Sequence, residues 1–169
     1  AHETPEHLVL RIVIGKKMHL GKNKVAGEWG HNPLPWAHES ELPGKKCFCG
    51  RTGCLETFIS GPAIEREFKN LHGRNLNMKN IVKESTEGNL KAEQVIKNLE
   101  DRLARALAHV INILDPDSIV LGGGLSNIDR LYSNVPKIWA EYIFSDDVST
   151  VLSKARFGDS SGVRGAAWL

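Results

Sequence analysis

The chain has 169 residues, of which 41% are hydrophobic, which is enough for one folded domain with a sizeable core and short for two. Its 22 Lys and Arg residues against 20 Asp and Glu residues give a formal net charge of +2, so charge favours neither nucleic acid nor a membrane as a partner. No stretch reaches the roughly 20 apolar residues of a membrane-spanning helix. The polar first seven residues lack the charged and apolar regions of a signal peptide. We therefore expect a cytoplasmic protein, and its charge is compatible with a small neutral substrate.

The first third of the chain predicts a hairpin and a long loop. An apolar, β-branched run over 8–15, a turn at 15–17 and a short stretch at 18–20 predict a hairpin. Residues 21–56 are rich in Gly, Pro and Trp and show no sustained period. A loop of this length is unusual in a compact domain unless function or a metal organises it.

The rest of the chain alternates between helices and strands. Apolar periodicity predicts a helix after Ser60 that stops at Gly73, a short helix over 78–83, and a long one over 90–114 that Asp115 and Pro116 end. A buried strand over 118–121, a helix from Ser126 or Asn127 to about 142, a strand over 148–157 and a last helix over 162–168 follow. This order defines the α/β class. The long helix suits either an ordinary core or a subunit interface, and its period favours the core.

Three cysteines, Cys47, Cys49 and Cys54, are the only ones in the chain and lie within eight residues. An odd, clustered set suits metal ligation in a reducing compartment better than a disulfide framework. Zn²⁺ accepts tetrahedral sulfur and imidazole ligands, and the neighbouring glycines let the backbone turn the thiols inward. The spacing therefore predicts a zinc site rather than three free buried cysteines.

The fourth ligand must come from elsewhere in the loop. Spacing leaves His31 and His38 open, and the more constrained backbone around the first favours His31. Four protein ligands close the coordination sphere, so we expect a structural zinc that does not activate water. Such an ion would fix the loop and aim Glu28 and Glu56 at one point, where two carboxylates and an imidazole can accept hydrogen bonds from sugar hydroxyls.

Two segments carry a family resemblance. Gly-Glu-Trp-Gly-His at 27–31 and Cys-Phe-Cys-Gly-Arg-Thr-Gly-Cys-Leu-Glu at 47–56 closely resemble the signature of the ROK family of bacterial sugar kinases and sugar-responsive repressors. The wider context at 27–36 and 158–167 is most similar to the fructokinase or manno(fructo)kinase branch. The resemblance implies that 12–169 form the sugar- and zinc-binding, carboxyl-terminal half of an actin-like (ribonuclease H-like) kinase. Residues 1–11 are then an atypical leader or a non-native remnant.

The resemblance also implies roles for particular residues. The side chains that contact the hexose hydroxyls are Glu28, His31 and Glu56. The zinc ligands are His31, Cys47, Cys49 and Cys54. The adenosine of ATP lies against Gly122, Gly123 and Gly124, although three glycines after a strand are by themselves a weak signal. Family analogy further implies a homodimer.

The sequence departs from the kinases of this family in one respect. Their Asp-Gly-Gly-Thr and Gly-Thr-Gly phosphate loops and their Asn-Asp pair, whose aspartate is the catalytic base, do not occur here. Residues 15–23 do not replace them, because five residues instead of four separate the glycines. We expect transfer of the γ-phosphoryl group of ATP, with Mg²⁺, only in an intact enzyme, and no phosphorylation by these 169 residues.

Two other functions compete with the kinase. The sugar-sensing half of a ROK-type repressor would use the same zinc loop, but residues 1–20 contain no helix-turn-helix and the charge gives no help to DNA binding. A purely structural zinc module, whose carboxylates are solvated, would serve partner or subunit docking instead.

Overall fold

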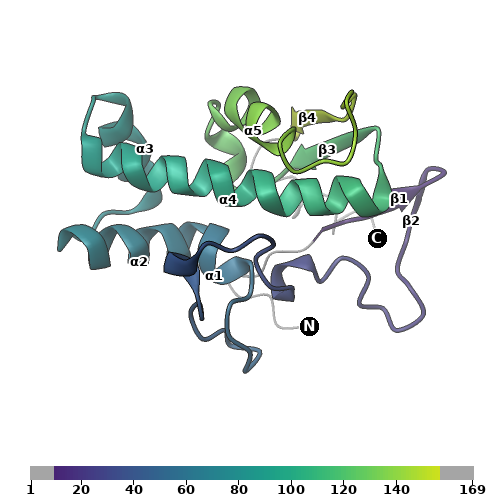
Figure 1. Cartoon of the computed structure of the whole chain (residues 1–169), viewed down its shortest axis with the longest axis horizontal. Helices are drawn as coiled ribbons and strands as arrows, with labels where there is room; N and C mark the ends of the chain where they lie inside the picture. Colours follow the sequence, from purple (N-terminus) through teal and green to yellow (C-terminus); the bar gives the residue numbers. More distant parts are fainter. Residues whose placement is uncertain (1–9, 157–169) are drawn as a thin grey trace.

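The computed structural model describes residues 10–156, and a single long helix organises them. Helix α4, Leu90–Leu114, runs through the middle of the molecule (Figure 1). Around it lie β1 (Val13–Ile14), β2 (Lys17–Met18), α1 (Glu56–Ile59), α2 (Gly61–His72), α3 (Met78–Thr86), β3 (Ser118–Leu121), α5 (Leu131–Trp139) and β4 (Val151–Lys154). Three short 3-10 turns join them: η1 (Trp29–His31), η2 (Glu39–Glu41) and η3 (Gly124–Asn127).

Local sequence signals explain both ends of α4. The side chain of Asn89 accepts hydrogen bonds from the backbone amides of Lys91 and Ala92, as an N-cap does. Asp115 ends the helix in the left-handed conformation, with a φ of 42°. Most of the residues between these ends are buried inside this one chain. The prediction of a core helix over 90–114 is thus confirmed.

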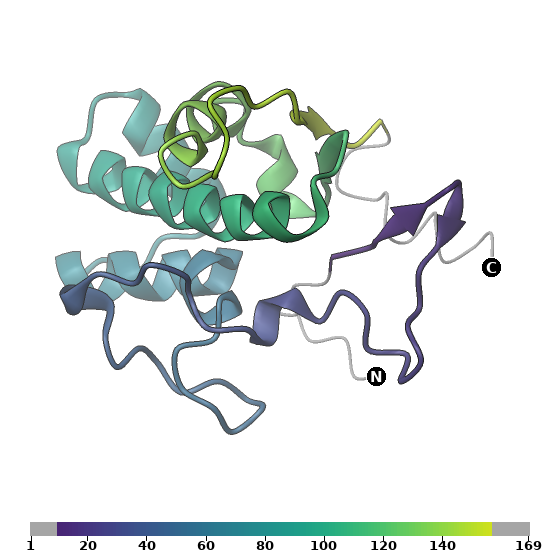
Figure 2. The same ribbon diagram turned by 45° about the vertical axis from the view of Figure 1, so that its right-hand side comes forward.

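The other elements form two layers against α4. Helices α1 and α2 lie on one side of it, and α3, α5, β3 and β4 lie on the other in both views (Figures 1 and 2). One apolar core joins the layers, with fully or nearly fully buried side chains from α2, α3, α4, β3 and α5, for example Phe68, Ile81, Leu99, Ile119 and Leu131. The long loop that carries the predicted zinc ligands lies beside α1, at the edge of this core.

The strands form two separate pairs within residues 10–156. β3 and β4 are parallel, and β1 and β2 form an antiparallel hairpin that stands apart from them (Figure 2). Gly15 and Lys16, with φ angles of 55° and 64°, make the hairpin turn. Positive φ at both central positions is typical of a two-residue hairpin. The α/β class and the hairpin are confirmed, and Gly15 lies in the hairpin turn.

Several predicted bounds differ from the structure. The first strand is only two residues long, because the amide of Leu10 bonds to the carbonyl of Gly27 at 2.7 Å instead of joining the hairpin. Helix α1 was not predicted, since four residues carry no readable period. Helix α5 begins at Leu131, because Ser126 donates its hydroxyl to the carbonyl of Gly123 within η3 instead of capping a helix. β4 spans only 151–154 of the predicted 148–157.

Two predictions fall wholly or largely outside the described residues, namely the last helix over 162–168 and the leader over 1–11. None of the helices that the structure describes is long and apolar enough to span a membrane.

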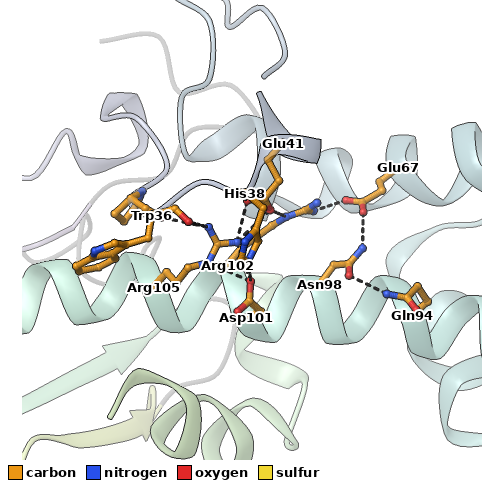
Figure 3. Close-up of polar contacts among 10 residues, drawn as sticks. Trp36, His38, Glu41, Glu67, Gln94, Asn98, Asp101, Arg102 and Arg105 are labelled. Atoms are coloured by element: carbon orange, nitrogen blue, oxygen red, sulfur yellow. Dashed lines mark hydrogen bonds and ion pairs between the residues drawn. The ribbon is translucent and has the colours of Figure 1, made fainter. Parts of the chain in front are cut away.

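A buried cluster of charges fastens the long loop to α4 (Figure 3). The guanidinium of Arg105 has no exposed surface and donates hydrogen bonds to both carboxylate oxygens of Glu41 at 3.0 Å. Arg102 donates a further hydrogen bond to Glu41 at 2.7 Å and pairs with Glu67 of α2. The carboxylate of Asp101 accepts from Arg105 at 2.7 Å and lies 3.7 Å from the His38 ring. Each guanidinium is thus paired with carboxylates of the cluster.

This cluster makes the stability depend on pH. Burial by itself raises the pKa of Glu41, but hydrogen bonds from Arg105, Arg102 and the His38 amide outweigh it and lower the pKa from its usual 4.5 to about 2. Because the folded-state pKa lies below the unfolded one, the ionised carboxyl stabilises the fold fully above about pH 4.5 and loses this contribution as the pH falls towards 2.

We expect this group to lower the free energy of unfolding by about 2 kcal/mol between pH 7 and pH 3. The Glu41→Gln variant has no carboxyl group to titrate at this position, so its stability should fall less steeply. Urea denaturation over this pH range, with a chelator present to exclude metal effects, measures both slopes. Equal acid slopes in the two proteins would contradict the assignment.

Candidate metal centre and adjoining cavity

One imidazole and three thiols gather at the base of the long loop. The potential ligand atoms of His31, Cys47, Cys49 and Cys54 all lie within 4.8 Å of one another. The Nδ1 atom of His31 is 3.6 Å from the Sγ atom of Cys47, and the Sγ atoms of Cys49 and Cys54 are 3.7 Å apart. A tetrahedral site with zinc–sulfur bonds of about 2.3 Å separates its ligands by about 3.8 Å. The donor set therefore suits Zn²⁺ in both chemistry and spacing.

The backbone explains how residues 16 to 23 positions apart meet. An isolated bridge pairs Pro33 with Cys54, and a second one pairs Lys46 with Thr52. The amide of Leu55 bonds to the carbonyl of Asn32 at 2.9 Å. These contacts form a short ribbon that carries His31 on one arm and the thiols on the other.

Two glycines make this ribbon possible. Gly53 has a φ of 80°, which favours glycine, and its Cα lies so close to Gly44 that a Cβ on Gly44 would be 2.6 Å from it. A side chain at Gly44 would thus collide with backbone. The glycines around the thiols therefore have the conformational role that the sequence suggested.

The structure separates the two histidines that the spacing left open. His31 belongs to the cluster, whereas His38 lies in the charged cluster on α4, with its Nε2 atom 3.7 Å from the carboxylate of Asp101. His38 is therefore not placed to complete the metal site, and the preference for His31 agrees with the geometry.

Glu56 lies directly behind the thiols. Its side chain is 2% exposed, and its Oε1 atom is 2.9 Å from the Sγ atom of Cys47 and 3.6 Å from Nδ1 of His31. Its Oε2 atom is buried and has no hydrogen-bond partner among the described residues. A buried carboxylate oxygen is costly to leave unpaired, so this atom marks a place for a donor that a ligand would supply.

The thiols differ in their acidity. Burial, followed by the hydrogen bond to Glu56, raises the pKa of the Cys47 thiol well above its usual value. The pKa of the exposed Cys49 is lowered, first of all by a backbone hydrogen bond from Arg51. Because zinc binds the thiolate form, the cation must displace a firmly held proton from Cys47.

A cavity of about 640 Å³ opens beside the cluster. Glu28 and His31 line it, together with three polar residues that the sequence did not single out: Asn32, Arg51 and His109. The remaining wall is mainly apolar and comes from the hairpin region and the end of α4. Glu56 lies behind His31 and does not line this cavity, so the three predicted sugar ligands share one neighbourhood around His31 without all facing one space.

The three glycines after β3 are exposed. Only Gly123 has a positive φ, of 71°, and a Cβ on Gly122, Gly123 or Gly124 would meet no described atom within 4 Å. Neither backbone strain nor packing within residues 10–156 therefore explains Gly122 and Gly124. They do not line the cavity beside His31.

Two solved structures resemble this chain closely. A ROK family glucokinase from Streptomyces griseus, in complex with glucose and AMPPNP, superposes with a TM-score of 0.79 at 25% identity over 93% of this chain and 55% of the glucokinase. A ROK family transcriptional regulator, a homologue of the E. coli MLC protein, superposes with a TM-score of 0.80 at 26% identity over 96% of this chain and 42% of the regulator. The fold and the His/Cys cluster thus define an α/β fragment of the sugar-kinase type with a candidate zinc site.

The sequence comparisons identify the family. The model of the ROK family matches residues 10–169, and the chain belongs to this family. An N-acetyl-D-glucosamine kinase of Vibrio parahaemolyticus is 38% identical over 157 residues, which are 90% of this chain and 52% of that kinase. Further curated relatives have the same name, and the chain spans about half the length of the curated relatives it matches.

These relatives correct one prediction. The context around 27–36 and 158–167 suggested the fructokinase or manno(fructo)kinase branch, and the comparisons do not support that branch. The first of these segments contains Gly-Glu-Trp-Gly-His, which belongs to the signature of the whole family and not of one branch.

Proposed function

We propose that this chain is the sugar-binding, zinc-containing part of an ATP-dependent kinase for an N-acetylated hexose, with N-acetyl-D-glucosamine as the first candidate. One observation carries the proposal: His31 belongs both to the three-thiol cluster and to the wall of the cavity that Glu28 lines. A metal bound there would hold the imidazole and the loop beside the sugar. The names of the relatives supply the choice of sugar.

The proposed division of labour follows from the side chains. The carboxylate of Glu28 accepts hydrogen bonds from sugar hydroxyls in the cavity. The free Oε2 atom of Glu56, which does not line that cavity, accepts a further one from a sugar that reaches past His31. His31 presents its ring beside them. A zinc ion on His31, Cys47, Cys49 and Cys54 has four protein ligands, so it acts as a structural ion and leaves no position for water.

The proposal also includes a place for the nucleotide. Gly122 and Gly124 have open space in front of them, which permits the close approach of an adenosine, as does their position after a strand. The intact protein would be a kinase of the actin-like (ribonuclease H-like) type. There the γ-phosphoryl group of ATP, with Mg²⁺, would be transferred to a sugar hydroxyl, and a base from the part absent from this sequence would take the hydroxyl proton. Residues 12–169 would position the sugar for this transfer.

A titration of the zinc-loaded chain with sugars tests this proposal. We expect N-acetyl-D-glucosamine to shift the NMR signals of residues around the cavity at lower concentration than glucose or fructose does. We also expect no phosphorylation in a coupled ADP assay, because the phosphate loops and the catalytic aspartate are missing from these residues. Equal responses to all three sugars would refute the choice of sugar, and hexose phosphorylation would refute the division of labour.

One observation supports a second function, the sensing domain of a ROK-type transcriptional regulator. The structure of the MLC homologue matches the chain as well as that of the glucokinase does. The curated relatives with the higher identities are kinases, which is why the kinase is preferred. Recovery of the upstream coding sequence separates the two, since phosphate loops indicate the kinase and a helix-turn-helix indicates the regulator. The homodimer and the cytoplasmic location stay predictions.

A further inference from the structure

The segment between the first zinc ligand and the thiols has an anchor of its own on α4. Residues 32–46 join His31 to Cys47, and Arg105 binds this segment at three places. It donates hydrogen bonds from Nη1 to the carbonyls of Pro35 at 3.1 Å and Trp36 at 2.9 Å, and from Nη2 to the carboxylate of Glu41. Figure 3 shows the guanidinium between α4 and the loop.

The anchored residues are next to the metal cluster in the chain and in space. Only Leu34 separates the Pro35 carbonyl from Pro33, which forms the bridge with Cys54. The amide of Leu34 itself bonds to the carbonyl of Gly53 at 3.2 Å. A displacement of the Pro35 carbonyl would thus be transmitted through one residue to the ribbon that holds His31 beside Cys54.

The neighbouring arginine connects the same cluster to α1. The guanidinium of Arg102 lies 5.5 Å from the centre of the Phe58 ring, within the range of a cation–π contact, while it binds Glu41 at 2.7 Å. Phe58 lies in α1, two residues after Glu56, which is the first residue of that helix. The cluster therefore touches both parts of the chain that carry the proposed sugar ligands.

We propose that Arg105, with Glu41, is a positioning group for the metal centre: it fixes the loop on α4 so that His31 is already beside the thiols when zinc binds. The inference depends on the proposed zinc centre and adds a residue that touches neither metal nor sugar. Closing a flexible loop between two sets of ligands costs conformational entropy, which a fixed loop has already lost. Groups that orient metal ligands from outside typically change metal affinity about 10- to 100-fold.

The planar fork of arginine is essential to this role. One guanidinium nitrogen reaches two carbonyls while another reaches a carboxylate and the Asp101 side chain. A lysine keeps the charge but offers one point of attachment. Arg105→Lys should therefore leave the charge balance unchanged and release at least one of the two carbonyls.

Arg130 offers a matched control. It also makes several charged hydrogen bonds to α4, to Glu93 at 2.6 and 2.9 Å and to Glu100 at 2.6 and 3.1 Å, but it has no described contact with the loop. Arg130 precedes α5 and binds α4 from there, so Arg130→Lys removes a similar fork without disturbing residues 32–46. Both variants should lose stability.

The test titrates the wild type and the two variants with Co²⁺ and monitors binding by the visible absorption of Co²⁺ in the thiolate site. A second titration measures Zn²⁺ binding in competition with a chromophoric chelator. All measurements are made well below the melting temperature of each protein. We expect Arg105→Lys to bind both metals about 10-fold more weakly than the wild type, and Arg130→Lys to bind them within 2-fold. Unchanged affinity in Arg105→Lys, or equal weakening in both variants, overturns the inference.

A second variant keeps the test decisive if Arg105→Lys does not fold. Glu41→Gln keeps the shape of the side chain but removes the charge that binds Arg105, and we expect it to weaken metal binding in the same way. The wild-type titration separates this inference from the proposed function. If the wild type binds no zinc, the metal centre is refuted. If the wild type and the Arg105 and Glu41 variants all bind zinc equally well, only the positioning role is refuted.

Discussion

Replacing Cys54 by serine is expected to remove zinc from the protein. The Sγ atom of Cys54 is buried, lies 3.7 Å from that of Cys49, and has no other thiol near enough to take its place. A hydroxyl is a far weaker zinc ligand than a thiolate, so we expect the affinity for zinc to fall at least about 100-fold. Elemental analysis should find one zinc per wild-type chain and almost none in Cys54→Ser.

The same variant should lose the part of the stability that depends on metal. Zinc binding to a structural site stabilises the fold, because the unfolded chain does not present the four ligands together. A chelator should therefore lower the melting temperature of the wild type to that of Cys54→Ser and should not lower that of the variant further. A metal-free wild type, or a chelator effect of equal size in both proteins, would contradict the zinc centre.

The two histidines provide a matched pair for this experiment. His31→Gln should release zinc, because its Nδ1 atom belongs to the ligand set. His38→Gln changes the same chemical group on the same loop but lies beside Asp101, outside the set. We expect its zinc content to equal that of the wild type.

The sequence correctly predicted the parts of the molecule that depend on local residue patterns. An apolar period of three and four residues indicated the extent of α4, and Asp115 followed by proline indicated its end. The thiols are close in sequence, so their spacing alone indicated a metal. Their meeting with His31 followed from the requirement for a fourth ligand.

The parts that were missed depend on contacts between distant residues. Arg105 and Glu41 are 64 residues apart, and a charged residue on a helix is normally solvated, so nothing in the sequence indicated this buried pair. His109, which lines the cavity from near the end of α4, was missed for the same reason. Helix α5 was placed too early because Ser126, a good cap residue, bonds to Gly123 in a 3-10 turn.

The fructokinase branch, which the wider sequence context suggested, is not supported by the comparisons, and the reason is related. Glu28, His31 and Glu56 are the proposed sugar contacts, and two carboxylates and an imidazole bind hydroxyl groups that most hexoses share. Fructose and an N-acetylated glucose differ by one or two hydroxyl contacts, which these three residues do not specify.

Glu28→Gln is expected to abolish detectable sugar binding while leaving the zinc in place. Glu28 lines the cavity beside His31 but is not part of the ligand set. A carboxylate can accept hydrogen bonds from two vicinal hydroxyls, whereas an amide offers one acceptor and one donor, so one of the two bonds is lost or reversed. Hydrogen bonds to a charged group contribute about 1.5–3 kcal/mol each, so the loss of one of them corresponds to a loss of affinity of about 10- to 150-fold.

NMR titration of the zinc-loaded chain with N-acetyl-D-glucosamine measures this effect, and Glu39→Gln is the matched control. Glu39 is an exposed acidic residue of the same loop that does not line the cavity, so the same chemical change there should leave sugar binding at the wild-type level. Equal binding by the wild type and Glu28→Gln would remove the carboxylate from the sugar site. Loss of binding in both variants would show a general effect of charge, and loss of zinc in Glu28→Gln would show that the carboxylate acts through the metal instead of through the sugar.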